Sequence, residues 1–143
     1  MRLLFIFAKQ SPMPKILFIA AHRPDRSPSQ RYRFEQYFDF LRSNGYECKL
    51  SYIIDDTDEK IFYGSGNIFG KLFITFKSAI KRWRDIKQSK KVDIVFIQRE
   101  AFMTGSTYFE KQFKRSKAKL VFDFDDSIWM LDTSEANKKW EWL

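Results

Sequence analysis

Short apolar runs alternate along the chain with longer segments of helical periodicity, and this order constrains the fold more than any other feature. Runs typical of buried strands lie at residues 15–20, 46–54, 92–98 and 118–124. Between them, apolar residues recur every three or four positions, as in a helix. This alternation predicts a parallel sheet with helices packed against it. We therefore expect an α/β fold with a Rossmann-like open parallel sheet of about four strands, ordered 3-2-1-4, and flanking helices.

The segment after the first strand carries helix-start signals. Ser27, Pro28 and Gln30 fit an N-cap, a proline at the first helical position and a capping-box partner. The apolar spacing that follows predicts one helix, which Asn44-Gly45 should end. A further helix is expected over 106–115.

Segment 68–89 predicts a long amphipathic helix. Its apolar stripe consists of Phe69, Leu72, Phe73, Phe76, Ile80 and Trp83. Its positive charges are Lys71, Lys77, Lys81, Arg82, Arg84 and Lys87. Such a helix most often covers a sheet and turns its charges to water. The same pattern is typical of attachment to an acidic membrane surface, and the two interpretations are compatible.

Length and composition indicate one globular domain. The chain has 143 residues, 44% of them hydrophobic, and we expect the folded domain to span 13–143 after an appendage at 1–12. The formal net charge of +8 favours anionic partners. The single cysteine, Cys48, forms no internal disulfide, so we expect a reducing, cytoplasmic location. Nucleic acid is not an expected partner, since no reading motif accompanies the charge.

Ligands of open parallel sheets bind beyond the carboxyl ends of the strands, so the loops after the first, third and fourth strands should share one rim. Arg23 and Arg26 belong to this rim. The substrate-binding candidates on it are His22, Gln30, Arg31, Arg33, Arg99, Glu100, Asp125, Asp126 and Trp129. The alternative for Asp125 and Asp126 is a structural turn that pairs with arginines, and Asp123 is expected to anchor that turn. The residues expected to be buried and structural are Phe34, Phe38, Ile94, Phe96 and Val121.

Three motifs follow one another within residues 14–140, in the order SPSQRYRFEQYFDFL, FIQREA and FDFDDSIW. Together they resemble the amino-terminal domain of bacterial family 4 glycosyltransferases, which have the GT-B architecture. The resemblance implies an acceptor-side domain for a glycan or lipid-linked acceptor, with the nucleotide-sugar donor bound by a second domain. It implies no metal and no other cofactor. It also implies polysaccharide or cell-envelope synthesis. Because of the charge and the aromatic stripe of segment 68–89, we expect the protein to be peripheral on the inner face of the cytoplasmic membrane.

Two other functions stay open. VFDFDDSIW also resembles the first motif of haloacid dehalogenase-type phosphatases, with Asp123 as nucleophile, Asp125 as general acid/base and magnesium as cofactor. That motif normally follows the first strand of its family, which argues against this function. The third possibility is a basic module that binds an anionic partner without chemistry.

The first prediction concerns activity. The resemblance places the donor contacts in a second domain that residues 1–143 do not contain, and sugar transfer needs both substrates held together. We therefore expect no measurable transfer from any nucleotide-sugar by this chain alone, with or without magnesium. A donor-consumption assay checks this, and turnover would contradict it. Magnesium-dependent phosphate release that Asp123→Asn abolishes would favour the phosphatase instead.

Overall fold

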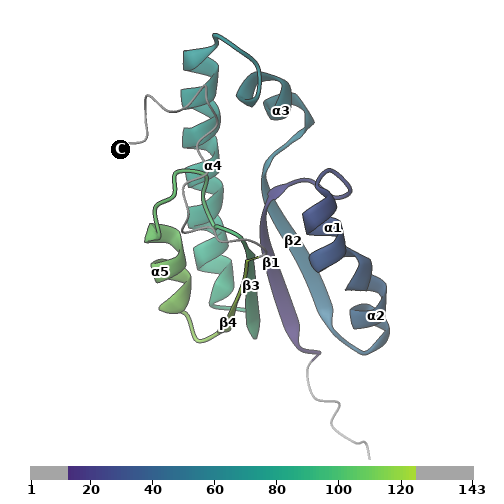
Figure 1. Cartoon of the computed structure of the whole chain (residues 1–143). Coiled ribbons are helices and arrows are strands. Elements are labelled where there is room, and N and C mark those ends of the chain that lie inside the picture. Colours follow the sequence, from purple (N-terminus) through teal and green to yellow (C-terminus); the bar gives the residue numbers. More distant parts are fainter. Residues whose placement is uncertain (1–12, 125–143) are drawn as a thin grey trace, which may run out of the picture.

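The protein forms an open, all-parallel sheet. A computed structural model describes residues 13–124 (Figure 1). Its strands are β1 (Lys15–His22), β2 (Glu47–Ile54), β3 (Ile94–Gln98) and β4 (Lys119–Asp123). Each pair of neighbours is parallel, with Leu17 aligned with Lys49 on one side and Val95 on the other. The predicted α/β class with four parallel strands is confirmed.

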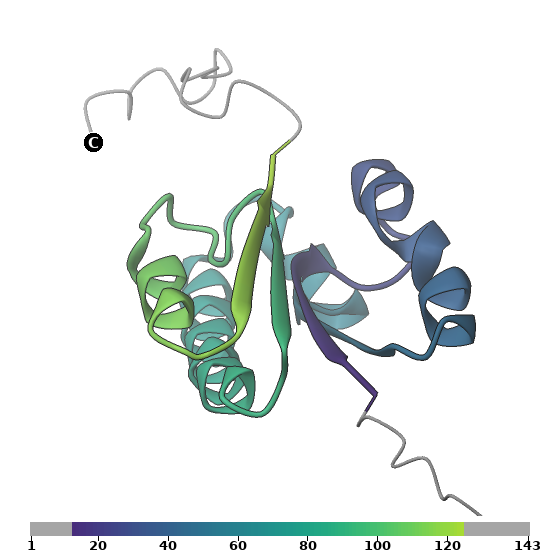
Figure 2. The ribbon, with the colours of Figure 1, turned by 90° about the horizontal axis from the view of Figure 1, so that it is seen from below.

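Helices cover both faces of the sheet (Figure 2). One face carries α1 (Pro28–Arg33), the 3₁₀ turn η1 (Glu35–Tyr37) and α2 (Phe38–Ser43). The other face carries α4 (Ile68–Ser89) and α5 (Tyr108–Lys114). Both were predicted from periodicity. A short helix that was not predicted, α3 (Asp56–Phe62), follows β2.

The strand order is β2-β1-β3-β4, so the predicted order 3-2-1-4 is wrong. β1 is apolar on both faces and buried along most of its length, which requires a neighbour on each side. β2 carries polar Glu47, Lys49 and Ser51 on alternate positions and suits an edge. The apolar run of β3 belongs inside the sheet. The winding therefore reverses after the second strand, and α4 carries the chain back across β1.

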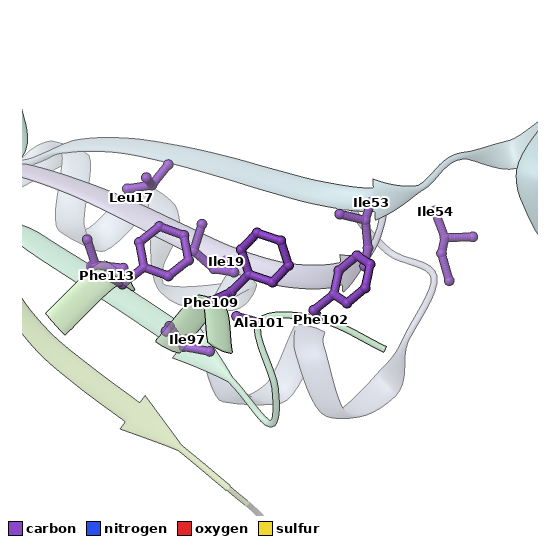
Figure 3. Close-up of a cluster of buried hydrophobic side chains, with 10 residues drawn as sticks. Leu17, Ile19, Ile53, Ile54, Ile97, Ala101, Phe102, Phe109 and Phe113 are labelled. Atoms are coloured by element: carbon purple, nitrogen blue, oxygen red, sulfur yellow. The ribbon is translucent and has the colours of Figure 1, made fainter. Parts of the chain in front are cut away.

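Each face of the sheet has its own apolar core. On the α4 and α5 face, Leu17, Ile19, Val95 and Ile97 meet the aromatic rings of the loop after β3 and of α5 (Figure 3). On the other face, Phe18 packs against the ring of Phe34 with 5.0 Å between centroids.

Of the five residues predicted to be buried, Phe34 is buried as expected. Phe38, Ile94 and Phe96 are only partly covered. Val121 is 42% exposed, which contradicts the prediction. The reason is the extent of the helical layer. α1 and α2 lie beside β1 and β2 and leave the β4 end of that face open (Figure 2).

The predicted helix from Pro28 breaks at Phe34, whose φ of −149° and ψ of −31° lie outside the helical region. Pro28 does begin the helix and Ser27 is its N-cap, but the Ser27 side chain makes no capping hydrogen bond. The expected capping box is therefore absent. Gln30 turns instead to the preceding loop, where its Nε2 donates to the carbonyl oxygen of His22 at 3.0 Å. Gly45, with φ +82°, follows the end of α2 as predicted.

Arg82 is buried inside the molecule, although the sequence placed it on the solvated face of α4. Its side chain has no exposed surface. The guanidinium donates to the carbonyl oxygens of Ala20 at 2.6 Å and Ala101 at 2.5 Å, and pairs with Asp85 at 2.9 Å. Ser51 donates to the same carboxylate at 2.7 Å. One side chain thus links α4 to β1 and to the segment after β3.

α4 consequently faces the sheet with its polar side. The buried residues of the helix are Ile74, Ser78, Arg82, Asp85 and Ser89. The apolar stripe points to solvent, with Phe69 86% exposed and Phe76 65% exposed. α4 covers the sheet as expected (Figure 2), but its apolar stripe faces water as well as its charges, which the sequence did not predict. No helix within residues 13–124 combines the length and apolarity that a membrane crossing requires.

The Arg82 network generates a stability prediction. Arg82→Met should lower the free energy of unfolding by about 3–5 kcal/mol, because Asp85 would stay buried without its cation. Arg82→Lys should also lose stability, since an ammonium lacks the planar fork that reaches several acceptors at once. Arg84→Gln, on the exposed side of the same helix, is the matched control and should change stability by less than about 0.5 kcal/mol. Urea unfolding measures all three. Equal losses for Arg82→Met and Arg84→Gln would contradict the role given to Arg82.

Candidate functional site

The unpredicted helix α3 stands at the carboxyl edge of the sheet. Asp55, at the end of β2, caps this helix by accepting from the backbone N–H groups of Thr57 at 3.1 Å and Asp58 at 2.8 Å. Lys77 of α4 donates to Asp55 at 2.8 Å and to Asp58 at 2.7 Å. These bonds, Lys77 above all, hold the pKa of Asp55 well below its usual value. The loop after the second strand thus joins the rim, from which the sequence interpretation had omitted it.

An open pocket of about 240 Å³, called here the His22 pocket, lies between the loop after β1 and Tyr63, the C-cap of α3. It is lined by His22, Arg26, Ser27, Pro28 and Tyr63. A groove of about 570 Å³ shares Arg26 and Tyr63 with it. That groove is also lined by Arg23, Asp56, Glu59, Lys60 and Gly64. The two hollows adjoin at Arg26 and Tyr63, beside the start of α1, and are together called the depression.

The arginines of this depression are paired with carboxylates. Arg23 bonds Asp56 at 2.5 Å and Glu59 at 3.3 Å, and the Arg26 guanidinium also bonds Glu59. The Arg26 contact lowers the pKa of Glu59, and the same contact raises the pKa of Arg26. The depression therefore presents both hydrogen-bond donors and hydrogen-bond acceptors.

His22 closes β1 and faces Tyr63. The two rings stack with centroids 6.1 Å apart, and His22 Nε2 lies 3.5 Å from the Tyr63 hydroxyl. His22 Nδ1 is buried and has no hydrogen-bond partner among the described residues. Burial lowers the pKa of His22, and the positive charge of Arg26 adds to the shift. His22 is therefore neutral at pH 7 and can accept a hydrogen bond from a hydroxyl group.

Gln30 was predicted to bind substrate but lies fully buried beneath the loop. Its Nε2 donates to the carbonyl oxygens of His22 and Arg23, at 3.0 and 3.3 Å, and to Glu35. Glu35 in turn accepts from the backbone N–H of Asp25 at 3.0 Å. Gln30 therefore shapes the depression from below.

A second part of the rim lies at the end of β4. Arg33 pairs with Asp123 at 3.4 Å, and the Asp123 carbonyl oxygen accepts from the Arg99 N–H at 2.7 Å. Arg99 has φ +62°, a left-handed conformation that residues other than glycine seldom adopt. Such outliers occur often at functional sites, and they motivate a hypothesis of function.

The remaining candidates do not line the His22 pocket. Arg31 is exposed on α1, with its guanidinium carbon 5.5 Å from the centre of the Tyr32 ring. Glu100 follows Arg99 at the surface, and desolvation raises its pKa. Asp125, Asp126 and Trp129 lie outside the described residues, so the structure does not place them.

Sequence reasoning missed Glu59 and Tyr63 because it ended the second strand in a loop. The run DDTDE, an N-cap aspartate followed by further acidic residues, is a helix-start signal that would have predicted α3. Tyr63 itself carries no such signal, since only the fold brings it to His22. Within residues 13–124, no cluster of three or more His, Cys, Asp or Glu side chains could hold a metal ion.

Comparison with protein-family models, curated proteins and solved structures gives no significant match to the chain.

The lowered pKa of His22 generates a prediction about pH. Its folded pKa lies below the usual 6.5, so the unfolded chain binds more protons than the folded one just below that pH. The free energy of unfolding should fall as the pH decreases from about 6.5 towards 5. His22→Gln should show a smaller fall over this window.

Urea unfolding at several pH values measures this difference. The raised pKa of Glu100 gives a slope of the opposite sign, but both proteins keep Glu100, so its contribution cancels in the comparison. Identical pH slopes for the two proteins would refute the lowered pKa of His22.

Proposed function

We propose that the His22 pocket and its adjoining groove bind a sugar acceptor, and that the chain is the acceptor-side portion of a glycosyltransferase. The acceptor is a glycan or a lipid-linked sugar. The donor is a nucleotide-sugar held by a further domain, and the protein works in the cytoplasm, peripheral on the inner face of the cytoplasmic membrane. The pairing of arginine with carboxylate around Tyr63 is the observation that carries this proposal.

The charge balance favours an uncharged ligand rich in hydroxyl groups. Arg23 and Arg26 are already paired with Asp56 and Glu59, so they offer hydrogen bonds more than net positive charge. A sugar hydroxyl both donates and accepts hydrogen bonds, which suits a site with both arginine and carboxylate groups. A free phosphate would instead favour unpaired arginines.

The aromatic residues complete the match. Tyr63 is 60% exposed and offers an apolar ring face beside these polar groups. Polar sites of this kind orient a ligand, while aromatic side chains supply contact area. Neutral His22 next to Tyr63 can accept the hydroxyl proton that an acceptor must lose during transfer.

The test uses backbone-amide NMR of the whole chain. The probe is a monosaccharide linked through diphosphate to a short prenyl tail, and the same tail diphosphate without sugar serves as ligand control. We expect the sugar-bearing probe to shift the amides of Arg23, of residues 25–27 and of residues 56–64. Tyr63→Ala should weaken its binding about three- to tenfold, because the ring contact is lost.

Tyr37→Ala is the matched control, since Tyr37 is also half exposed but lies outside the depression. It should leave the affinity unchanged. Equal binding of the tail diphosphate without sugar, or shifts confined to another surface, would overturn the proposed sugar site.

A further inference from the structure

We propose that α4 lies on the surface of an anionic membrane, and that the groove between α4 and the edge strand β2 holds the headgroup of an anionic phospholipid. This assigns a surface to the peripheral location proposed above. It does not depend on the sugar site, because the groove shares no lining residue with the His22 pocket.

The outer side of α4 is an aromatic surface. Its exposed side chains are Ile68, Phe69, Leu72, Phe73, Phe76, Ile80 and Trp83. The surface continues onto α5, where the Tyr108 ring meets Trp83 with centroids 5.7 Å apart. A contiguous apolar patch of this kind on a folded domain marks an interaction site.

A groove of about 670 Å³ runs beside this surface, between α4 and β2. Its apolar lining comes from Leu50, Phe73, Phe76 and Ile80. Its cationic lining comes from Lys49, Lys77, Lys81 and Arg84. Apolar and positive groups therefore meet in one groove, and the aromatic rings of Phe73 and Phe76 belong to both the groove and the outer surface.

Most of the positive charge of the groove is not cancelled by ion pairs among the described residues. Asp85 is its one acidic lining residue, and Asp85 is already bonded by Arg82 and Ser51. Lys77 is neutralised by Asp55 and Asp58. Lys81 sits over the Tyr52 ring, 4.2 Å from its centre.

Lys49 and Arg84 form no ion pair within residues 13–124. With Lys81, they give the groove a net positive charge. The ligand should therefore carry negative charge as well as an apolar part.

These features favour a phospholipid over the other occupants. A free phosphate would satisfy the cations but leave the apolar lining in water. A second copy of the chain would bring the same cations against one another, which is unfavourable. A membrane surface accepts aromatic rings at the headgroup boundary and supplies phosphate groups to lysine and arginine.

The experiment is cosedimentation of the whole chain with vesicles. One set is pure phosphatidylcholine, and the other contains equal parts of phosphatidylcholine and phosphatidylglycerol. We expect binding to the second set that weakens with added salt. No binding to the anionic vesicles, or equal binding to both sets, would overturn the proposal.

Two double substitutions on α4, each with a matched control pair elsewhere, locate the contact. Lys81→Gln with Arg84→Gln should weaken vesicle binding about 25-fold, whereas Lys117→Gln with Lys119→Gln, which removes equal charge at the start of β4, should weaken it much less. Phe73→Ser with Phe76→Ser should weaken binding by about 100-fold or more. Tyr32→Ser with Phe40→Ser, two exposed aromatic residues on the α1 and α2 side, should retain binding.

Circular dichroism verifies that each variant is folded, and sedimentation velocity reports self-association. Equal effects of the α4 variants and their controls would contradict the assigned surface. Displacement from vesicles by inorganic phosphate at constant ionic strength would mean that the groove takes a free anion. Self-association that Phe73→Ser with Phe76→Ser abolishes, without vesicle binding, would identify the face as a contact between copies. The vesicle measurements contain no sugar. If the sugar-binding test fails, the vesicle results can therefore still be interpreted independently.

Discussion

The buried guanidinium of Arg82 is the interaction on which the arrangement of this protein depends. Backbone carbonyl groups near the ends of strands need hydrogen-bond partners when helices cover them. Arg82 supplies donors to Ala20 and Ala101, and Asp85 balances its charge. Burying one charged partner alone would be costly, whereas this side chain is paired and hydrogen-bonded throughout. The orientation of α4 follows, since Arg82 must face the sheet.

That orientation has consequences at two surfaces. Turning Arg82, Asp85 and Ser78 inward turns the aromatic residues of α4 outward, which creates the surface for which we propose a membrane. The same helix places Lys77 against Asp55 and Asp58, at the start of α3. α3 is followed directly by Tyr63, which stacks on His22. A single helix thus organises both the proposed lipid surface and the proposed sugar site, and Lys77 takes part in both by lining the groove and bonding Asp55 and Asp58.

At the rim, the sequence pattern predicted where residues lie better than it predicted what they do. The order of strands and helices placed His22, Arg33, Arg99 and Asp123 at one edge, because carboxyl ends of parallel strands share an edge. The roles of individual residues at that edge were harder to predict from the sequence. Gln30 was chosen as a ligand-binding group but is buried under the loop. Glu59 was overlooked, although it pairs with both Arg23 and Arg26. The identity of a polar residue does not show whether it binds a ligand or another residue of the fold.

The sequence by itself determined the α/β class, the parallel strands and the extent of the long helix, because these depend on local apolar periodicity. Tertiary structure alone decided the strand order. β1 and β3 take the two interior positions of the sheet, and that choice depends on how the whole sheet is covered on both faces. It also decided which side of α4 is buried. Apolar periodicity predicts that the aromatic stripe is the inner face of the helix. It contains no information about the hydrogen bonds from Arg82 to carbonyl groups on segments distant in the chain. Hydrogen bonds between remote segments outweighed the local pattern there.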